Sequence, residues 1–574
     1  MRLKVIRLAI SLLFLIVAGG LVYTQLIRGP YYFNLSKNNR IRVVAFEARR
    51  GKILDRNGVM LAGSRVSFDV MIIPQEIQDK SVLFAYLGEQ LSAESVKLLE
   101  RYEKKKLAPF TPVTVAEDIP KSVALVLEEN KFRFPGLWIY ATNRRYYPFN
   151  EVGAHVLGYV GQVSRSRLNK LKDYGYTLQG MTGYTGIEEY YDSYLRGGDG
   201  GSQIEVNSRG QQVRILGIKE PVSGQDIILS IDSRIQKMAA ETLQEYKGAI
   251  VMMDWDTGEI LAMVSSPSFD LNAFMAEGRD KEVTQIMHNA DSPLMNRAIA
   301  GLFPPGSTFK IPIAVGALEK RLIQPGTTFN CPGYYKLGRR RFRCSHAHGI
   351  QNLTEGIAHS CNVYFYNTGL LLGPELISRY AELFGLGMIT NIDLPGEVKG
   401  SIPNPEKKRV LRKEGWYQGD TLNLSIGQGD VMVTPLQLTK MMAIVARNGR
   451  DIQPHVFRAT QGSAMGDDRF KAEARLDIKQ ETFAAVKAGL RGAVGDYAGT
   501  AHLLDIEGLK ISGKTGTAQT SGGRPTHAWF TGFCTDCQPK IAFCVFLEFG
   551  GSSYIATREA RKLLIRLKEA NIFQ

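Results

Sequence analysis

The chain has 574 residues, more than one hydrophobic core usually takes, so we expect two or more domains. Hydrophobic residues make up 44% and charged residues 22%, close to the average of globular proteins, which excludes a disordered chain, a collagen, a coiled coil and a protein with many membrane spans. Lys and Arg number 71 against 56 Asp and Glu, and this basic balance allows nucleic acid, anionic lipid or another acidic partner. Six cysteines are too few for a disulfide scaffold.

The first predicted element is a membrane anchor. The cationic residues Arg2, Lys4 and Arg7 precede an uncharged run over 8–27, which as a helix is about 30 Å long, one hydrocarbon thickness. The cationic start predicts a cytoplasmic N-terminus and a single pass through the cytoplasmic membrane, with the remainder of the chain outside, in the periplasm. The alternative is a cleaved signal ending near 18–20, but the apolar run continues beyond it.

Export of the bulk of the chain argues against nucleic acid as a partner. The basic runs most often indicate solvated surface, and the alternative is a surface that faces phospholipid headgroups or an anionic cell envelope. These runs lie at 104–106, 339–341 and 407–409.

Beyond the anchor, short strands and helices alternate up to about residue 220. The pattern predicts a strand over 66–73 and helices over 92–104 and 120–129. The glycine-rich segment 196–202 predicts a flexible connection.

From about residue 225 the pattern changes. An amphipathic helix is expected over 233–246, and the apolar runs 249–253 and 260–264 flank a turn signal typical of a hairpin. Three further strands are expected over 509–512, 528–534 and 541–548, and a basic amphipathic helix over 556–570. Helices between antiparallel hairpins favour an α+β layered fold with an antiparallel sheet flanked by helices. We therefore expect an anchor over 1–28, a pedestal of mixed structure over 29–224 and a C-terminal domain over 225–574.

Three short motifs in the C-terminal part indicate the chemistry. They are Ser307-Thr-Phe-Lys310, Ser360-Cys-Asn362 and Lys514-Thr-Gly516. Each motif alone arises by chance in many chains, but the set in this order, with the last on an expected edge strand, is typical of serine acyltransferases of the penicillin-binding type.

The residues around Ser307 have a physical interpretation. Two prolines and Gly306 break the chain before Ser307, so that Ser307 opens a helix where free N–H groups favour developing negative charge. Lys310 lies on the same helix face and is a base for the serine hydroxyl if burial and a nearby cation lower its pKa; Lys514 is the candidate cation. Pro312 disturbs this helix and predicts a kink. The alternative interpretation is a serine N-cap with a solvated lysine one turn later.

The chain resembles the class B penicillin-binding proteins, most closely the penicillin-binding protein 2 group, over nearly its whole length. The segments that carry the resemblance are 50–58 (RGKILDRNG), 155–161 (HVLGYVG), 186–197, 293–298 (PLMNRA), 304–310 (PPGSTFK), 425–430 (SIGQGD) and 434–438 (TPLQL). The double proline before Ser307 is similar to the elongation enzymes, whereas the division paralogues more often have an acidic residue there.

The resemblance implies the fold and a role for each motif residue. The pedestal would be dimerisation-like and the C-terminal domain a transpeptidase. Ser307 would attack a D-Ala-D-Ala stem peptide, Lys310 would take its proton, and Ser360 would relay a proton to the leaving D-Ala. Asn362 would hold the acyl amide. Lys514, Thr515 and Thr517 would bind the terminal carboxylate on the strand that contains Gly516, and the N–H groups of Ser307 and Thr517 would form the oxyanion hole.

The expected function is therefore a peptidoglycan D,D-transpeptidase of cell elongation and rod shape, inhibited by β-lactams. Because no glycosyltransferase domain is recognised, the resemblance implies a RodA-like glycosyltransferase and the elongation complex as partners. The alternatives are a division-type class B transpeptidase, a D,D-carboxypeptidase or β-lactamase, and a binding protein that senses β-lactams or activates the polymerase.

Cysteines and histidines around the second motif predict a structural zinc site, while catalysis is expected to need no cofactor. Cys331, Cys344, His348 and Cys361 suit a tetrahedral zinc, with His346 as the alternative to His348. The competing interpretation is a Cys331–Cys344 disulfide with Cys361 a buried thiol.

The remaining cysteines and histidines receive simpler predictions. Cys534 and Cys537 are candidates for a turn disulfide, and Cys544 is expected in the core. His155 is expected to be structural, and His527 to line the rim of the active site.

Overall fold

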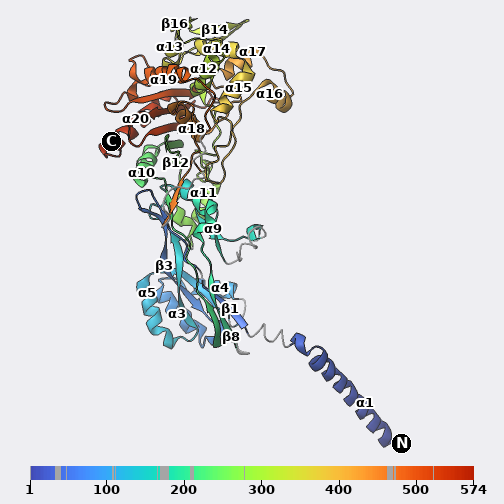
Figure 1. Cartoon of the computed structure of the whole chain (residues 1–574). Helices are drawn as coiled ribbons and strands as arrows, with labels where there is room; N and C mark the ends of the chain where they lie inside the picture. Colours follow the sequence, from blue (N-terminus) through green and yellow to red (C-terminus); the bar gives the residue numbers. More distant parts are fainter. Residues whose placement is uncertain are drawn as a thin grey trace. The chain divides into compact units, whose positions relative to one another are not determined.

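The structure is a computed structural model that describes residues 2–32, 41–46, 48–106, 109, 111–164, 166–168, 180–206, 212–276, 278–461, 470, 474–520 and 522–573 (Figure 1). It divides into two compact units. Unit 1 comprises Met1–Gly51, Ser64–Arg144 and Arg196–Gly224, and unit 2 comprises Lys52–Gly63, Arg145–Leu195 and Gln225–Gln574. The domain bounds expected from the sequence stay a prediction.

Unit 1 begins with the helix α1 (Arg2–Val22), which continues as a short π-helix, η1 (Tyr23–Ile27). Within the described part of the chain, the segment Leu3–Ile27 is the one helix that is long and apolar enough to cross a membrane, with a mean hydropathy of 2.5. Its leucines and isoleucines are exposed, as expected of side chains that contact lipid.

Unit 1 also contains a three-stranded antiparallel sheet of β1 (Ile41–Phe46), β8 (Gly200–Val206) and β9 (Gln212–Lys219), with β8 in the middle. The expected flexible connection over 196–202 is therefore wrong, because Gly200–Ser202 pair with β1 and Gly198 pairs with Val222. A Cβ on Gly200 would lie 2.4 Å from the carbonyl oxygen of Lys219. The glycine here permits close strand approach rather than flexibility.

The rest of unit 1 is a small α+β core. The strand β3 (Met60–Ile72) pairs with β4 (Val113–Ile119) and β5 (Leu137–Tyr146). Three helices pack on these strands: α3 (Lys80–Gln90), α4 (Ser95–Lys105) and α5 (Lys121–Asn130). Val70, Leu87 and Leu127 are fully buried at this contact. The predicted strand and both predicted helices are confirmed.

The centre of unit 2 is a five-stranded antiparallel sheet in the order β12-β11-β20-β19-β18. Its strands are β11 (Gly248–Asp254), β12 (Ile260–Ser266), β18 (Ile511–Ala518), β19 (His527–Cys534) and β20 (Ile541–Leu547). The predicted hairpin and the three later strands are confirmed, and β18 lies a few residues later than expected, at the edge of the sheet.

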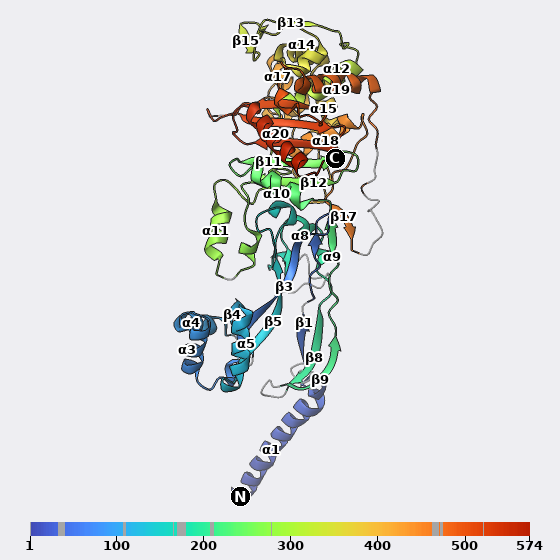
Figure 2. The same cartoon turned by 90° about the vertical axis from the view of Figure 1, so that its left-hand side faces the viewer.

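Helices cover both faces of this sheet (Figure 2). Alternate residues of β11 point to opposite faces. Ile250 and Met252 pack with α10 (Ser233–Thr242) and α20 (Ser553–Glu569), and Val251 and Met253 pack with α18 (Pro435–Ala446). Because helices bury both faces of the sheet, its strands are almost continuously apolar.

The helical part of unit 2 holds the site. It contains α12 (Lys310–Glu319), α13 (Leu353–Ala358), α14 (Asn362–Leu372), α15 (Pro374–Leu383), α16 (Pro405–Arg412), α17 (Gln418–Leu424) and α19 (Gln480–Gly495). Two small hairpins lie in the same region: β13 (Phe329–Cys331) with β16 (Gly349–Gln351), and β14 (Tyr334–Leu337) with β15 (Arg340–Arg343). Other helices and strands of unit 2 are β2 (Ile53–Leu54), α6 (Ala154–Leu157), β6 (Val160–Gln162), β7 (Met181–Gly183), α8 (Gly186–Tyr190), α9 (Asp192–Leu195), β10 (Ile227–Leu229), α11 (Asp280–His288) and β17 (Phe457–Thr460). The α+β prediction is confirmed.

Candidate active site

Ser307 lies in a short 3-10 helix, η6 (Gly306–Phe309), that leads directly into α12. Gly306 has a φ of +56°, and a Cβ there would lie 2.7 Å from the carbonyl oxygen of Thr517 in β18. The glycine therefore allows the start of the helix to touch the edge strand. Pro312 is the third residue of α12, where its missing N–H falls in the first turn, and the helix continues to Glu319. The first and third motifs thus meet.

Lys310 connects the first motif to the second. Its side chain is fully buried, and its Nζ donates hydrogen bonds to Ser360 O at 2.7 Å, Ser360 Oγ at 3.2 Å and Asn362 Oδ1 at 2.7 Å. Among the described residues no hydrogen bond joins Ser307 to this amine. This is compatible with a catalytic role, because hydrogen bonds between catalytic groups commonly tighten only when substrate is bound.

The two lysines of the motifs share a buried environment. Burial lowers the pKa of Lys310 to about 8, partly opposed by the negative charge of Cys344 and Cys361. Burial, followed by the positive charge of Lys310, holds the pKa of Lys514 well below its usual value. Burial is thus the first cause that lowers the pKa of both lysines, and the role of Lys514 as the cation beside Lys310 stays a prediction.

The second motif lies in the turn between α13 and α14. Ser360 has a φ of +56°, an unusual value for a residue with a side chain and one that is often retained at functional sites. Cys361 caps α14 by accepting a hydrogen bond from Tyr364 N, and Asn362 Nδ2 donates to Arg343 O at 3.3 Å. These contacts hold Ser360 and Asn362 beside Lys310.

The third motif lies on β18. Lys514 is buried opposite Thr531 and donates to Thr515 O at 3.3 Å. Thr515 Oγ1 donates to Thr500 Oγ1 at 3.0 Å, and Thr517 Oγ1 accepts a hydrogen bond from Ser553 N at 3.3 Å. The Thr517 hydroxyl therefore lies next to the start of α20, and the Thr515 hydroxyl lies next to Thr500.

The three motifs surround one cavity of about 650 Å³. Its lining includes Ser307, Ser360, Asn362, Thr515 and Thr517 from the motifs. The sequence did not indicate several other lining residues, which include Ser345, Gln351, Ala498, Thr500, Ser552, Ser553 and Tyr554. These residues belong to no motif, and only the packing of distant segments identifies them.

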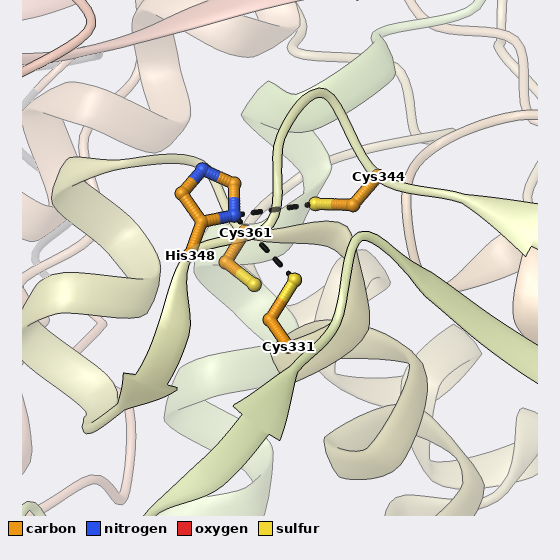
Figure 3. A group of neighbouring side chains, drawn as sticks. All are labelled: Cys331, Cys344, His348 and Cys361. Carbon is orange, nitrogen blue, oxygen red and sulfur yellow. Dashed lines mark hydrogen bonds between the residues drawn. The ribbon is translucent and has the colours of Figure 1, made fainter.

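The predicted metal ligands converge beside this cavity (Figure 3). The ligand atoms of Cys331, Cys344, His348 and Cys361 all lie within 4.8 Å of one another, and His348 Nδ1 lies 3.5 Å from the sulfur atoms of both Cys331 and Cys344. All three cysteines are free thiols, so the alternative Cys331–Cys344 disulfide is not formed. His346 contributes its carbonyl oxygen, which accepts a hydrogen bond from Cys331 Sγ.

The spacing of these atoms fits a tetrahedral metal. Bonds of about 2.3 Å to sulfur and 2.0 Å to nitrogen at tetrahedral angles place ligand atoms about 3.6 Å apart. Cys344 Sγ also accepts a hydrogen bond from Asn362 N at 3.2 Å. The hydrogen bond between the two thiols lowers the pKa of Cys344 and raises the pKa of Cys361, so Cys344 is the first of the pair to form the thiolate that binds metal. The donor set therefore fits a tetrahedral metal ion.

Comparisons with known proteins agree with this geometry. Residues 248–564 match the penicillin-binding protein transpeptidase domain, and residues 45–229 match the penicillin-binding protein dimerisation domain. The peptidoglycan D,D-transpeptidase MrdA of Acinetobacter baumannii is 34% identical over 93% of this chain and 83% of its own length. The chain belongs to the class B penicillin-binding proteins, of the penicillin-binding protein 2 type.

Solved structures of this family are also similar to the chain. Penicillin-binding protein 2 of Helicobacter pylori, in complex with MreC, has a TM-score of 0.81 at 30% identity, covering 92% of this chain and 99% of its own. A chain of a peptidoglycan synthase complex that coordinates polymerization and crosslinking has a TM-score of 0.75, covering 98% of this chain and 97% of its own.

The remaining cysteines and histidines of this penicillin-binding protein lie outside the cavity lining. Cys534 and Cys537 form the predicted disulfide, and Cys544 is a buried thiol whose pKa is raised by burial. His155 is buried and bonded to Pro293 O, with its pKa lowered by burial to about 4. The expectation for His527 is wrong: it is buried among aromatic rings and does not line the cavity.

Proposed function

We propose that this penicillin-binding protein is the D,D-transpeptidase that cross-links peptidoglycan stem peptides during cell elongation and acts through an acyl-enzyme on Ser307. The supporting observation is the hydrogen-bonded contact of buried Lys310 with Ser360 and Asn362, next to Ser307 and β18. The MrdA relatives, which match this chain over most of their own length, are named peptidoglycan D,D-transpeptidases.

The proposed first half-reaction acylates the enzyme. Ser307 Oγ bonds to the carbonyl carbon of the penultimate D-Ala while neutral Lys310 takes the hydroxyl proton. The bond from this carbon to the nitrogen of the terminal D-Ala breaks, and Ser360 passes a proton from Lys310 to that nitrogen. Asn362 holds the acyl amide. A buried lysine with a pKa near 8 is suited to this exchange, since ideal catalytic pKa values lie near the working pH.

The second half-reaction releases the enzyme. The amine of another stem peptide bonds to the acyl carbon, the bond from Ser307 Oγ to that carbon breaks, and the proton of the amine returns through Lys310 to Ser307. Both half-reactions place negative charge on the carbonyl oxygen, which the N–H groups of Ser307 and Thr517 would stabilise.

The substrate carboxylate has a proposed site on β18. Lys514, Thr515 and Thr517 would bind the terminal carboxylate of the donor, because Thr515 and Thr517 line the cavity. Gly516 has no Cβ, and one would lie 2.7 Å from Pro305 O, so this glycine keeps the strand next to Ser307.

We also propose that the Cys/His cluster holds one structural zinc through Cys331, Cys344, His348 and Cys361. Four protein ligands would leave no position for water, so the metal would supply order and no Lewis acid chemistry. Elemental analysis of protein purified without added metal should give about one zinc per chain. A ratio near zero, with a Cys331–Cys344 disulfide in the mass spectrum, would contradict this.

The proposed setting is the outer side of the cytoplasmic membrane. The anchor 1–28 would cross the membrane once, and the pedestal 29–224 and the transpeptidase domain 225–574 would both lie outside. A RodA-like glycosyltransferase would supply glycan strands to this enzyme. The relatives support this setting, since one is bound to MreC and another lies in a complex of polymerization and crosslinking.

Intact mass spectrometry tests the function. Penicillin should add covalently to the wild-type chain, and Ser307→Ala should abolish the adduct while leaving the thermal melting temperature within about 2 °C, as expected of a surface hydroxyl. Incubation with a D-Ala-D-Ala donor and an amine acceptor should give a cross-linked product and free D-Ala. Release of D-Ala with water as the only acceptor would indicate a D,D-carboxypeptidase instead.

A further inference from the structure

The hairpin β14–β15 carries a cationic surface that the proposed reaction does not use. Its segment 334–343 contains five cationic residues and no acidic one. We call these five residues the basic hairpin: Lys336, Arg339, Arg340, Arg341 and Arg343. All five are exposed.

The pairing of the two strands places like charges together. Lys336 lies directly opposite Arg341, and Arg343 follows on the same face of the hairpin. Like charges directly opposite on paired strands are destabilising. Among the residues that the structure describes, no carboxylate forms an ion pair with any member of the basic hairpin. Within this described part of the chain, the repulsion between Lys336 and Arg341 is therefore not neutralised.

The guanidinium groups are ordered by aromatic rings instead of by carboxylates. Arg341 lies over the Tyr334 ring at 4.7 Å, and Arg340 lies over the Phe342 ring at 5.0 Å. Phe342 is itself buried and fixes the hairpin to the domain. Stacking leaves the N–H groups of an arginine available for a planar anion, which they bind in a bidentate manner.

The basic hairpin is joined to the wall of the active-site cavity. Arg343 O accepts hydrogen bonds from Asn362 Nδ2 and Tyr366 OH, both at 3.3 Å. The chain leaving the hairpin passes through Cys344 to Ser345 and His346, which line the cavity. A substrate that extends from the cavity on the side of Asn362 therefore reaches this surface.

We propose that the basic hairpin binds the carboxylates of the acceptor stem peptide, an inference that rests on the proposed transpeptidase function. The donor carboxylate already has a site on β18, whereas the acceptor must bring its amine to the acyl group from elsewhere. A stem peptide that still ends in D-Ala carries a free carboxylate, so its charge complements the hairpin. This position beside Asn362 favours the acceptor over a lipid surface or another anionic polymer.

Charge reversal of the opposed pair tests this inference. The variant Lys336→Glu/Arg341→Glu is compared with a control of equal charge change, Lys237→Glu/Lys281→Glu, whose lysines are exposed on α10 and α11 and do not line the cavity. Full-length protein, in detergent and in bilayers rich in phosphatidylglycerol, is assayed for cross-linking with an acidic acceptor peptide and with the same peptide amidated at its carboxylates.

The acidic acceptor should half-saturate the hairpin variant at a concentration about tenfold above that of the wild type, since exposed charge contacts are individually modest. The amidated acceptor should not distinguish the three proteins, and the control should match the wild type with both acceptors. Added salt should weaken the wild type's preference for the acidic acceptor.

Three outcomes would overturn the inference: equal use of the acidic acceptor by hairpin variant and wild type, an equal loss with both acceptors, or a defect only in bilayers rich in phosphatidylglycerol. The last outcome would assign the hairpin to a lipid surface. Failure of the proposed transpeptidase function can be told apart from failure of the hairpin inference, because the wild type would then form neither a penicillin adduct nor a cross-link.

Discussion

The buried position of Lys310 predicts how acylation depends on pH. With a pKa of about 8 instead of 10.5, about one molecule in eleven has a neutral Lys310 at pH 7, and about ten in eleven at pH 9. Because the base must be neutral to take the proton of Ser307, the acylation rate should rise about tenfold between these pH values and level off above them. An unburied lysine would still be mostly charged at pH 9, and the rate would keep rising.

Stopped-flow acylation by a fluorescent penicillin measures this profile. Lys310→Ala should slow acylation by about 10²–10⁴-fold and remove the rise near pH 8. Lys320→Ala, an exposed lysine at the end of α12, should keep both the rate and the profile of the wild type. A wild-type rate that does not change between pH 7 and 9, or a rise that survives in Lys310→Ala, would refute the assignment of the base.

Three other substitutions give further expectations. Gly306→Ala should slow acylation at least tenfold, because its Cβ would lie 2.7 Å from Thr517 O; an unchanged acylation rate would contradict the close contact. Lys514→Ala should raise KM for a carboxylate-bearing substrate by a larger factor than it lowers kcat. Steady-state kinetics in which kcat falls and KM stays unchanged would argue against a binding role. Glu188→Ala should lower the free energy of unfolding by about 3–5 kcal/mol, because it leaves the buried Arg145 without this carboxylate; a urea titration showing less than about 1 kcal/mol would contradict this.

The three motifs and the Cys/His cluster could be found in the sequence because their chemistry restricts residue types and spacing. Ser307 and Lys310 are one helical turn apart, and three thiols with a histidine are few enough to be noticed together. The segment 196–202 was misjudged because glycine content alone does not separate a flexible linker from a strand that needs close approach.

Other parts of the site depend on contacts between distant segments. Thr500 and Ser552 reach the cavity through packing that no local pattern encodes. His527 was misplaced because its position at the start of a strand does not show which face its ring takes, and here that face is the aromatic core. The burial of both lysines, which lowers their pKa values, likewise depends on contacts between distant segments.

The edge strand β18 has a consequence for solubility. An uncovered sheet edge offers a row of free backbone groups to any other extended chain and promotes aggregation. Here the strand is covered at both ends: Ile511 O accepts a hydrogen bond from Arg491 of α19, and Thr517 O lies against Gly306 of η6. The contacts that bring Ser307 to the strand therefore also shield the strand from other copies of the protein, so that strand pairing is left to a peptide that enters the cavity.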